Sequence, residues 1–396
     1  MTATQNGHAH DSHAHNEQNT SRPGLGGPGL GGPDTSAATG GLAGVPLSLE
    51  PLTRKDFTSD QEVRWCPGCG DYAVLAAFQA FMPELGIRRE NTVIISGIGC
   101  SSRFPYYVNS YGMHSIHGRA PAIASGLAIA RPDLGVWVVT GDGDALSIGG
   151  NHLIHLLRRN INVTILLFNN RIYGLTKGQY SPTSEIGKVT KSTPLGSLDT
   201  PFNPVSLALG AEASFVARTV DSDRKHLTEV LKAAAAHRGT SFVEIYQNCP
   251  IFNDGAFDAL KDRETAVDAI IPLRHGEKIT YGARSEEGHG RLGLVRDPVS
   301  GAFEVAEVAK VGIESIITHD AHAQDPSYAF GLSRLTDAGA LNRSPIGIFR
   351  QVNRTAYDDA ARAQLTLASD QAGHAQYGDE AALHQLLTGG DTWNVG

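Results

Sequence analysis

Several features that are common in membrane, secreted and nucleic-acid-binding proteins are missing from this chain of 396 residues. No apolar run approaches the ~18–20 residues that a membrane-spanning helix needs. The N-terminus has neither the basic start nor the apolar stretch of a secretory signal, so we expect a cytoplasmic protein. The formal net charge is −8, and the basic residues form no face suited to nucleic acid or to an anionic membrane. The composition therefore indicates partners other than nucleic acids and membranes.

Cysteine is scarce, with only Cys66, Cys69, Cys100 and Cys249 in the chain. Four cysteines are too few for a disulfide scaffold of this length, but four is the number of ligands that one metal centre needs. Cys66 and Cys69 form a CxxC turn, which alone fits half a zinc site, a redox dithiol or one side of an iron–sulfur cluster. No second CxxC or HxxxH pair accompanies it, whereas Cys100 and Cys249 each follow a predicted strand. The four could close a cage for a 4Fe–4S cluster, with zinc and uncommitted thiols as alternatives.

Composition divides the chain into three parts. Residues 1–45 contain mostly Gly, Pro, Ser, Thr, Asn and His, so we expect a disordered tail. Its spaced histidines leave a weak metal-binding tract as an alternative: His8, His10, His13 and His15. Residues 258–396 contain a possible hairpin around Asp297–Gly301 and an amphipathic segment near Tyr357–Leu367. We predict that this part is an extension that packs on the core or on a partner.

The central part, residues 46–257, has the alternating pattern of an α/β fold. Its candidate strands are Thr92–Ser96, Val136–Thr140, Val163–Phe168, Ser214–Thr219 and Phe242–Tyr246. The candidate helices between them are Tyr72–Met82, Pro121–Ala130, Leu146–Arg159, Pro204–Leu209 and Asp223–Arg238. Because the strands are almost continuously apolar, they predict a parallel sheet covered by helices on both faces.

A Gly141-Asp142-Gly143 turn follows one of these strands directly. Such a turn lets the backbone approach a phosphate, and the free N–H groups of the next helix face the same anion. Asp142 supplies a hard oxygen ligand for Mg²⁺. An Asn169-Asn170 pair ends the following strand, at the same edge of a parallel sheet, so an oxygen of Asn170 can meet the same ion. The pattern predicts a site for phosphate and Mg²⁺.

This arrangement resembles the thiamine-diphosphate motif, in which a GDG turn is followed one strand later by an NN pair. Here 25 residues, 144–168, separate the two. By that resemblance Asp142, Asn170 and the backbone carbonyl of Ile172 bind the metal. The segments CPGCGDY, SGIGCSSR, HSIHGR, GDGDALSIGGNH and NNRIYGLTKGQYSPTS, within residues 47–257, also resemble the β subunits of 2-oxoacid:ferredoxin oxidoreductases.

The resemblance implies the diphosphate domain of the thiamine-diphosphate-binding fold and one 4Fe–4S cluster on the four cysteines. The positions that it assigns to thiamine are Ile98, Gly99, Cys100, Ser101, Gly143, Asp144, Gly174 and Leu175. Gly141 of the turn and His117 of the His117-Gly118-Arg119 cluster are further candidates, although His117 could equally cap a strand end. The implied reaction is oxidative decarboxylation of 2-oxoglutarate, or a related 2-oxoacid, with coenzyme A to acyl-CoA, CO₂ and reduced ferredoxin.

Only one α/β domain is evident, and it carries the diphosphate half of a thiamine site. We therefore expect an α subunit to supply the other half, and expect this chain alone to be inactive. Lys177 could meet a substrate carboxylate or coenzyme A, or could be a solvated surface lysine. Three other functions fit parts of the sequence: a non-redox thiamine decarboxylase or synthase, an electron-transfer iron–sulfur module with an empty GDG loop, and a zinc-bound interaction protein.

Overall fold

The computed structural model describes residues 40–282, 290–337, 339, 341–372 and 380–389. The predictions made for residues 1–39, including the histidine tract, lie outside this range. Residues 40–45, which we assigned to the disordered tail, are folded instead: a 3-10 turn spans Gly40–Leu42 and Val45 is buried. The carbonyl of Gly41 accepts a 2.8 Å hydrogen bond from the Asn162 side chain. This bond attaches residues 40–45 to the core.

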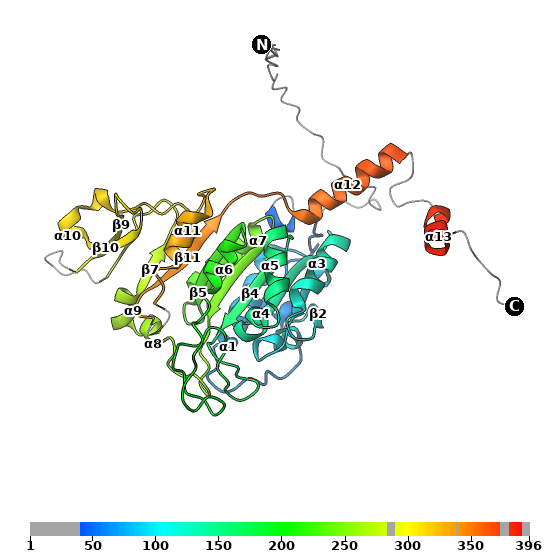
Figure 1. Ribbon diagram of the computed structural model, residues 1–396. Helices are drawn as coiled ribbons and strands as arrows, with labels where there is room; N and C mark the ends of the chain where they lie inside the picture. The colour runs from blue at the N-terminus through cyan, green and yellow to red at the C-terminus, as the bar shows by residue number, and fades with distance from the viewer. Residues whose placement is uncertain (1–39, 283–289, 338, 340, 373–379, 390–396) are drawn as a thin grey trace, which may run out of the picture. The chain divides into compact units, whose positions relative to one another are not determined.

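The main sheet has eight strands in the order β2-β1-β3-β4-β6-β5-β11-β7 (Figure 1). Every neighbouring pair is parallel except β11 and β5, which run antiparallel. In that order the strands span Tyr111–His114, Thr92–Ser96, Gly135–Gly141, Thr164–Asn169, Ser241–Tyr246, Phe215–Val220, Ser344–Gln351 and Ile270–Leu273. The predicted α/β fold with a parallel sheet is confirmed, and all five predicted strands belong to it.

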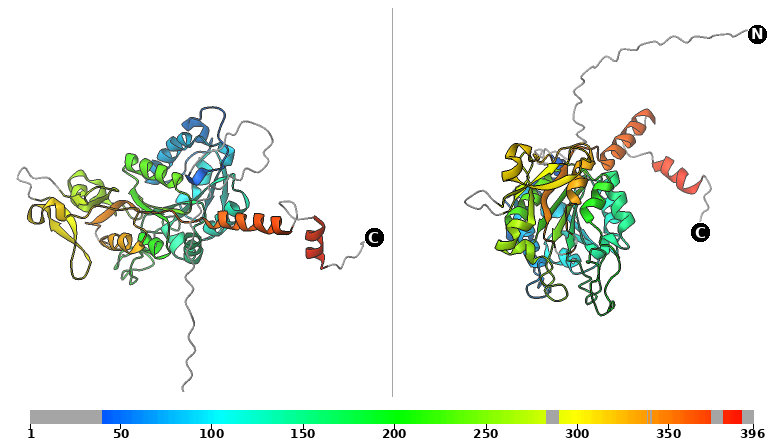
Figure 2. Two further views of the ribbon diagram at one scale, coloured as in Figure 1. Left: turned by 90° about the horizontal axis from the view of Figure 1, so that it is seen from above. Right: turned by 60° about the vertical axis from the view of Figure 1, so that its left-hand side comes forward.

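Helices cover both faces of this sheet, because successive strand residues point to opposite sides. One apolar cluster joins the strands to five helices: α3 (Ala120–Ala130), α4 (Asp142–Leu146), α5 (Gly150–Arg159), α6 (Pro204–Gly210) and α11 (Pro326–Ser333). A second cluster, on the other face, joins them to α1 (Asp71–Phe81) and α7 (Arg224–Ala236) (Figure 2). Strand β1 shows the alternation directly, since Val93 and Ile95 belong to the first cluster and Ile94 to the second.

The helix predicted over Leu146–Arg159 is two helices, α4 (Asp142–Leu146) and α5. The break falls at Gly149, where a β-carbon would lie 2.5 Å from the Asp144 carbonyl oxygen and 3.0 Å from the α-carbon of Gly118. The tight contact between two chain segments therefore replaces one helical turn. Helix α4 starts at Asp142 itself, four residues earlier than predicted.

The region after residue 258 contributes to the main sheet through β7 and β11. It also forms a three-stranded antiparallel sheet from β8 (Thr280–Tyr281), β9 (Leu292–Arg296) and β10 (Phe303–Glu307). The β9–β10 pair is the hairpin predicted around Asp297–Gly301. The amphipathic segment becomes α12 (Tyr357–Ala372), which Arg362 ties to α3 through the carbonyl of Ala128 at 3.2 Å.

The remaining elements are short. They are the helices α2 (Phe104–Tyr107), α8 (Asp258–Lys261), α9 (Arg263–Ala269), α10 (Val308–Val311) and α13 (Glu380–Thr388), and 3-10 turns at Arg54–Phe57, Met82–Leu85, Arg89–Asn91, Ser101–Arg103 and Ile313–Ser315. Within the described ranges, each helix falls short of the length and apolar character required to cross a bilayer.

Candidate cofactor site and cysteine centre

A cavity of about 430 Å³ opens beside the carboxyl ends of β1, β3 and β4. Because these strands are parallel, the loops that follow them meet at one edge of the sheet. The cavity is lined by Ile98–Ser101 after β1, by Gly141–Asp144 after β3, by Gly174 and Leu175 after β4, and by His117. The structure thus gathers around one cavity every residue that the sequence analysis assigned to the cofactor.

Asp142 begins α4 at the wall of this cavity, with 2% of its surface exposed. Its Oδ2 atom accepts hydrogen bonds from the hydroxyl groups of Ser181 at 2.5 Å and Thr183 at 2.6 Å. Burial raises the pKa of Asp142 to about 6, although these hydroxyl groups act in the opposite direction. A buried carboxylate fits a Mg²⁺ site, since the ion would supply the positive charge that offsets the cost of burial.

Asn170 and Ile172 line the same cavity. The Asn170 side chain accepts a 3.1 Å hydrogen bond from the Ile172 N–H group and donates one of 3.1 Å to the Gln247 side chain. The Asn170 carbonyl accepts a 2.9 Å bond from the Asn253 side chain. These bonds hold the loop after β4 in one shape. The predicted ligands are the Asp142 carboxylate, the Asn170 side-chain oxygen and the Ile172 carbonyl. All three are oxygen atoms, the donors that Mg²⁺ prefers.

Asp144 also lines the cavity, but both of its carboxylate oxygens bind protein groups. Oδ1 accepts from the Gly118 N–H group at 2.8 Å, and Oδ2 accepts from the Thr140 hydroxyl at 2.8 Å. Asp144 therefore ties the loop that carries His117 to the Gly-Asp-Gly turn. His117 itself is exposed at the cavity wall.

The three segments that carry the cysteines are tied together by hydrogen bonds. The indole N–H of Trp65, next to Cys66, donates to the carbonyl of Cys100 at 2.7 Å. The N–H group of Gly70, next to Cys69, donates to the carbonyl of Asn248 at 3.1 Å, one residue before Cys249. Segments more than 30 and 170 residues apart in the chain thus meet at one place.

The four thiols lie close enough to influence one another. A β-carbon on Gly174 would lie 3.5 Å from the Cys100 sulfur and 3.6 Å from the Cys249 sulfur. Burial raises the pKa of the Cys100 thiol to about 12, and the nearby Asp71, Cys249 and Cys66 add to the rise. Burial likewise raises the pKa of the Cys69 thiol, and the neighbouring Asp71, Cys249 and Cys100 add to the rise. The segments that carry the cysteines therefore meet in the fold, while the use of the four thiols as ligands of one cluster stays a prediction.

Their spacing differs from that of a single-ion site. Within the described part of the chain, no three His, Cys, Asp or Glu side chains approach closely enough to hold one metal ion. In a 4Fe–4S cluster the four cysteines bind the cluster's separate iron atoms, so their sulfurs lie farther apart than around one zinc ion. Four thiols on segments that meet at one place, with Cys100 and Cys249 next to Gly174, form a donor set that fits a cluster of this type.

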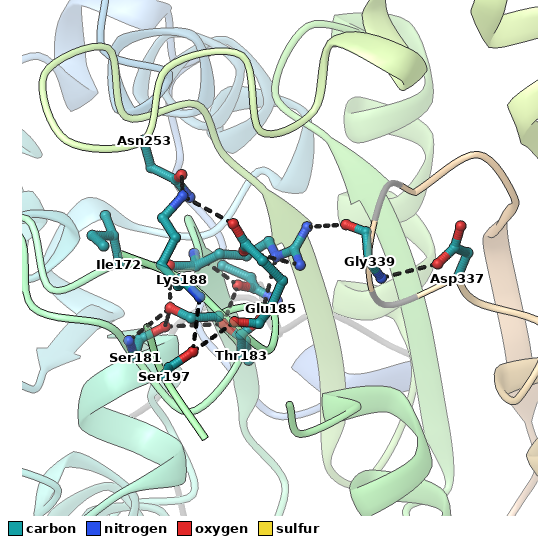
Figure 3. Close-up of polar contacts among 12 residues, drawn as sticks. Ile172, Ser181, Thr183, Glu185, Lys188, Ser197, Asn253, Asp337 and Gly339 are labelled. Carbon is teal, nitrogen blue, oxygen red and sulfur yellow. Dashed lines mark hydrogen bonds and ion pairs between the residues drawn. The ribbon is translucent and has the colours of Figure 1, made fainter. Parts of the chain in front are cut away.

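A network of charged and polar side chains braces the loops around this site (Figure 3). Arg171 contacts Glu185 at 3.2 Å, and Glu185 contacts Lys188 at 3.0 Å. Lys188 donates to the Asn253 side chain, which in turn donates to the carbonyl of Asn170. Asn253 follows Cys249 by four residues and its N–H group bonds the Cys249 carbonyl at 3.0 Å. The loop after β4 and the Cys249 loop are therefore held by the same cluster.

Lys177 does not line the cavity. Its side chain is exposed and its backbone has a φ of 75°, in the left-handed region that few non-glycine residues adopt. The N–H group of Lys177 bonds the carbonyl of Gly174 at 3.0 Å, so the residue closes a turn beside the cavity.

Sequence reasoning missed several residues that line the cavity. They are Ser147, Ile148, Tyr173, Thr176 and Gln179. Tyr173, Thr176 and Gln179 lie in the NNRIYGLTKGQ segment, and their closeness in sequence to the Asn pair could have indicated that they line the site. Ser147 and Ile148 line it because α4 ends at Leu146, which the predicted single long helix concealed.

Known proteins that are similar to this chain include thiamine-dependent enzymes and subunits of 2-oxoacid oxidoreductases. Residues 97–245 match the family model described as thiamine pyrophosphate enzyme, C-terminal TPP binding domain. The chain is similar to "2-oxoglutarate oxidoreductase subunit KorB" of Mycobacterium tuberculosis, with 66% identity over 353 residues that cover 89% of this chain and 91% of the relative. It is also similar to "2-oxoacid:ferredoxin oxidoreductase 1, subunit beta" of Aeropyrum pernix, with 48% identity over 48% of this chain and 60% of that relative.

A solved structure has the same fold. It is a chain of 2-oxoglutarate:ferredoxin oxidoreductase from Magnetococcus marinus, described with 2-oxoglutarate, coenzyme A and succinyl-CoA bound. The two chains superpose with a TM-score of 0.66 and 32% identity, covering 86% of this chain and 99% of the other.

Proposed function

The chain belongs to the β-subunit family of 2-oxoacid:ferredoxin oxidoreductases, and on that basis we propose that it oxidises 2-oxoglutarate together with an α subunit. The products would be succinyl-CoA, CO₂ and reduced ferredoxin. The substrate assignment is supported by the Mycobacterium tuberculosis relative, which carries 2-oxoglutarate in its name, and by the Magnetococcus marinus structure, which holds 2-oxoglutarate and coenzyme A.

One observation carries the proposal: Cys100 lines the cofactor cavity, and its sulfur and that of Cys249 both lie next to Gly174, which lines the same cavity. Thiamine diphosphate, when bound, supplies the carbon that attacks the 2-oxo group and accepts the electrons left by loss of CO₂. A cluster on Cys66, Cys69, Cys100 and Cys249 would be reached from that cavity through a single residue. The geometry supports a short path for electrons leaving the thiamine site.

The chain's own residues would hold and orient the cofactor. Asp142, Asn170 and the carbonyl of Ile172 would bind Mg²⁺, and the ion would neutralise the diphosphate. The N–H groups at the start of α4, next to Gly143, would face the same anion. Asp144 would keep the His117 loop against the turn, so that His117 borders the cofactor.

An α subunit would complete the cavity. The described chain offers the diphosphate half of the site. Two apolar side chains are exposed here: Ile148, which lines the cavity, at 58%, and Ile116, which precedes the cavity residue His117 in the chain, at 70%. Covering such side chains favours association with a partner. We retain Lys177, on the turn beside the cavity, as the candidate that meets the 2-oxoacid or coenzyme A when this partner is present.

The decisive experiment is an assay of the chain co-expressed with its α subunit and purified without oxygen. We expect reduction of ferredoxin that requires both 2-oxoglutarate and coenzyme A, broad absorption near about 400 nm from the cluster, and thiamine in the denatured supernatant. Colourless protein with decarboxylase activity would instead identify a non-redox thiamine enzyme. Coloured protein without thiamine would identify an electron-transfer module.

A further inference from the structure

An ion pair lies inside the main sheet, close to the cofactor site but not in its wall. Arg218 on β5 and Glu244 on β6 are register partners, and their side chains are 1% and 0% exposed. The Arg218 Nε atom lies 2.6 Å from Glu244 Oε2. Burying two charges costs free energy that their attraction often fails to recover, and apolar side chains would fill the same place. The pair therefore calls for an explanation other than fold stability.

The second carboxylate oxygen of Glu244 contacts the Asn pair at the end of β4. Glu244 Oε1 accepts a 2.7 Å hydrogen bond from the side-chain NH₂ of Asn169, the first residue of the Asn pair. This bond turns the amide so that Asn169 Oδ1 points away from Glu244. Asn169 Oδ1 then lies 2.9 Å from the Thr183 hydroxyl and 3.2 Å from the Arg171 N–H group. Asn169 is 3% exposed and does not line the cofactor cavity.

Thr183 connects Asn169 to the predicted metal ligand. Its hydroxyl oxygen lies 2.6 Å from Asp142 Oδ2, the oxygen that Ser181 also contacts. The hydroxyl group carries one proton, so it donates to Asp142 or to Asn169 at any moment, and the two neighbours together fix where its oxygen lies. Ser181 and Thr183 are 2% and 4% exposed. The chain of contacts Arg218–Glu244–Asn169–Thr183–Asp142 is buried along its whole length.

Arg218 is itself anchored from the region after residue 258. One of its terminal nitrogens donates to the Thr336 hydroxyl at 2.8 Å and to the carbonyl of Pro345 at 3.3 Å. The aromatic rings of Tyr246 and Phe349 lie 5.1 Å and 5.4 Å from the guanidinium carbon. With five donors in a rigid plane, such an arginine holds Glu244 in one orientation.

We propose that the buried Arg218–Glu244 pair is a positioning device for the metal-binding carboxylate of Asp142, and that it acts through Asn169 and Thr183. This inference rests on the proposed function, in which Asp142 binds Mg²⁺. Side chains behind the ligands of a metal site orient those ligands, and their loss lowers metal affinity by about 10–100-fold. Glu244 and Thr183 are therefore positioning residues for the thiamine site, although neither touches the cofactor cavity.

The test measures Mg²⁺ affinity rather than turnover. The full chain, co-expressed with its α subunit and stripped of divalent ions by a chelator, is dialysed against thiamine diphosphate at increasing Mg²⁺ concentration, and the retained cofactor is counted. The variants are Thr183→Val, Thr183→Ser, Glu244→Gln and the double substitution Arg218→Met with Glu244→Leu. The double substitution removes both charges, so it keeps a foldable core should Glu244→Gln leave Arg218 unpaired.

The matched control is Thr240→Val. Thr240 is fully buried, and its hydroxyl donates a 2.6 Å hydrogen bond to the carbonyl of Ile161. Thr240 directly precedes β6, so it lies at the opposite end of that strand from the cavity. Its loss removes a buried hydroxyl of the same kind without touching the chain of contacts to Asp142.

We expect Thr183→Val, Glu244→Gln and the double variant to need about 10–100-fold more Mg²⁺ for half-maximal retention of thiamine diphosphate. Thr183→Ser and Thr240→Val should behave like the wild type. Wild-type Mg²⁺ dependence in folded Glu244→Gln and double variants would overturn the proposal, even if Thr183→Val alone were impaired. A wild-type complex that retains no thiamine diphosphate at any Mg²⁺ concentration would instead overturn the proposed function.

Discussion

The Tyr173 hydroxyl donates a 3.1 Å hydrogen bond to the carbonyl of Gly143, so the loop after β4 is fastened to the turn after β3. The ring passes so close that a β-carbon on Gly143 would lie 2.2 Å from one of its atoms. Only glycine leaves room for this contact, which joins the two halves of the thiamine motif. The ring of Tyr173 therefore restricts the third position of the Gly-Asp-Gly turn to glycine, independently of any bound phosphate.

Gly143→Ala should displace Tyr173 and lower the free energy of unfolding by about 1–3 kcal/mol, as overpacked cores do. Because the displaced loop carries Asn170 and Ile172, bound thiamine diphosphate should be lost as well. Urea unfolding and cofactor content measure the two effects. Tyr173→Phe is the comparison: it loses one hydrogen bond, about 1 kcal/mol, and keeps the ring in place, so it should retain the cofactor.

The sequence predicted the parts of this fold whose signals are local. Continuous apolar runs marked the central strands, and the motif residues at their ends therefore fell at one edge. Strand β2 was not predicted, because it is only four residues long, all of them exposed, and lacks the continuous apolar run of the central strands. Strand β11 escaped because it contains Pro345 and Gly347, residues that usually argue against a central strand.

The contacts that support Asp142 from behind could not be predicted from the sequence, because they join residues that lie far apart in the chain. Ser181 lies 39 residues from Asp142 in the chain, in a loop without periodicity, and only the folded structure brings them together. Arg218 and Glu244 read as polar positions on two strands, 26 residues apart. Their pairing depends on the parallel register of β5 and β6, which a local sequence pattern does not contain.

Asp142→Ala should abolish binding of Mg²⁺ and thiamine diphosphate while leaving the colour of the cluster intact. The carboxylate is the charged ligand of the predicted metal site, and it lies in a different loop from the four cysteines. Retained cofactor and visible absorption of the purified complex report on the two sites separately. Loss of colour together with the cofactor would show that Asp142 serves the fold rather than the metal.

Cys100→Ser should bleach or convert the iron–sulfur cluster, because a serine hydroxyl replaces a thiolate ligand. Iron and sulfide analysis of anaerobically purified protein measures the change. Ser102→Ala is a matched control, since Ser102 lies buried in the same loop and its hydroxyl has no hydrogen-bond partner among the residues that the structure describes. Unchanged iron content in Cys100→Ser would remove this residue from the set of ligands.

Lys177→Gly separates two roles of one residue. The backbone of Lys177 has a φ of 75°, which glycine adopts without strain, so the variant should be as stable as the wild type or more stable by about 1 kcal/mol. If the ammonium group meets the 2-oxoacid or coenzyme A, kcat/KM should fall by at least tenfold. Full activity in the more stable variant would identify Lys177 as a surface residue that closes a turn.

Stability toward acid should depend on His237, which is 6% exposed and shares a 2.7 Å hydrogen bond with the Ser214 hydroxyl. Burial lowers the pKa of His237 from 6.5 to about 4, because the charged imidazolium would lose its hydration. In the unfolded chain this imidazole binds a proton below about pH 6.5, whereas in the folded chain it binds one only below about pH 4. The stability contributed by the neutral ring is complete above pH 6.5 and is lost as the pH falls through this window, by about 2 kcal/mol at pH 5.

His237→Gln is neutral at every pH, so its free energy of unfolding should rise relative to the wild type by that amount as the pH is lowered from 8 to 5. His155→Gln, on the exposed side of α5, should follow the wild type closely. Parallel pH curves for His237→Gln and the wild type would show that the buried ring accepts its proton as readily as it does in the unfolded chain.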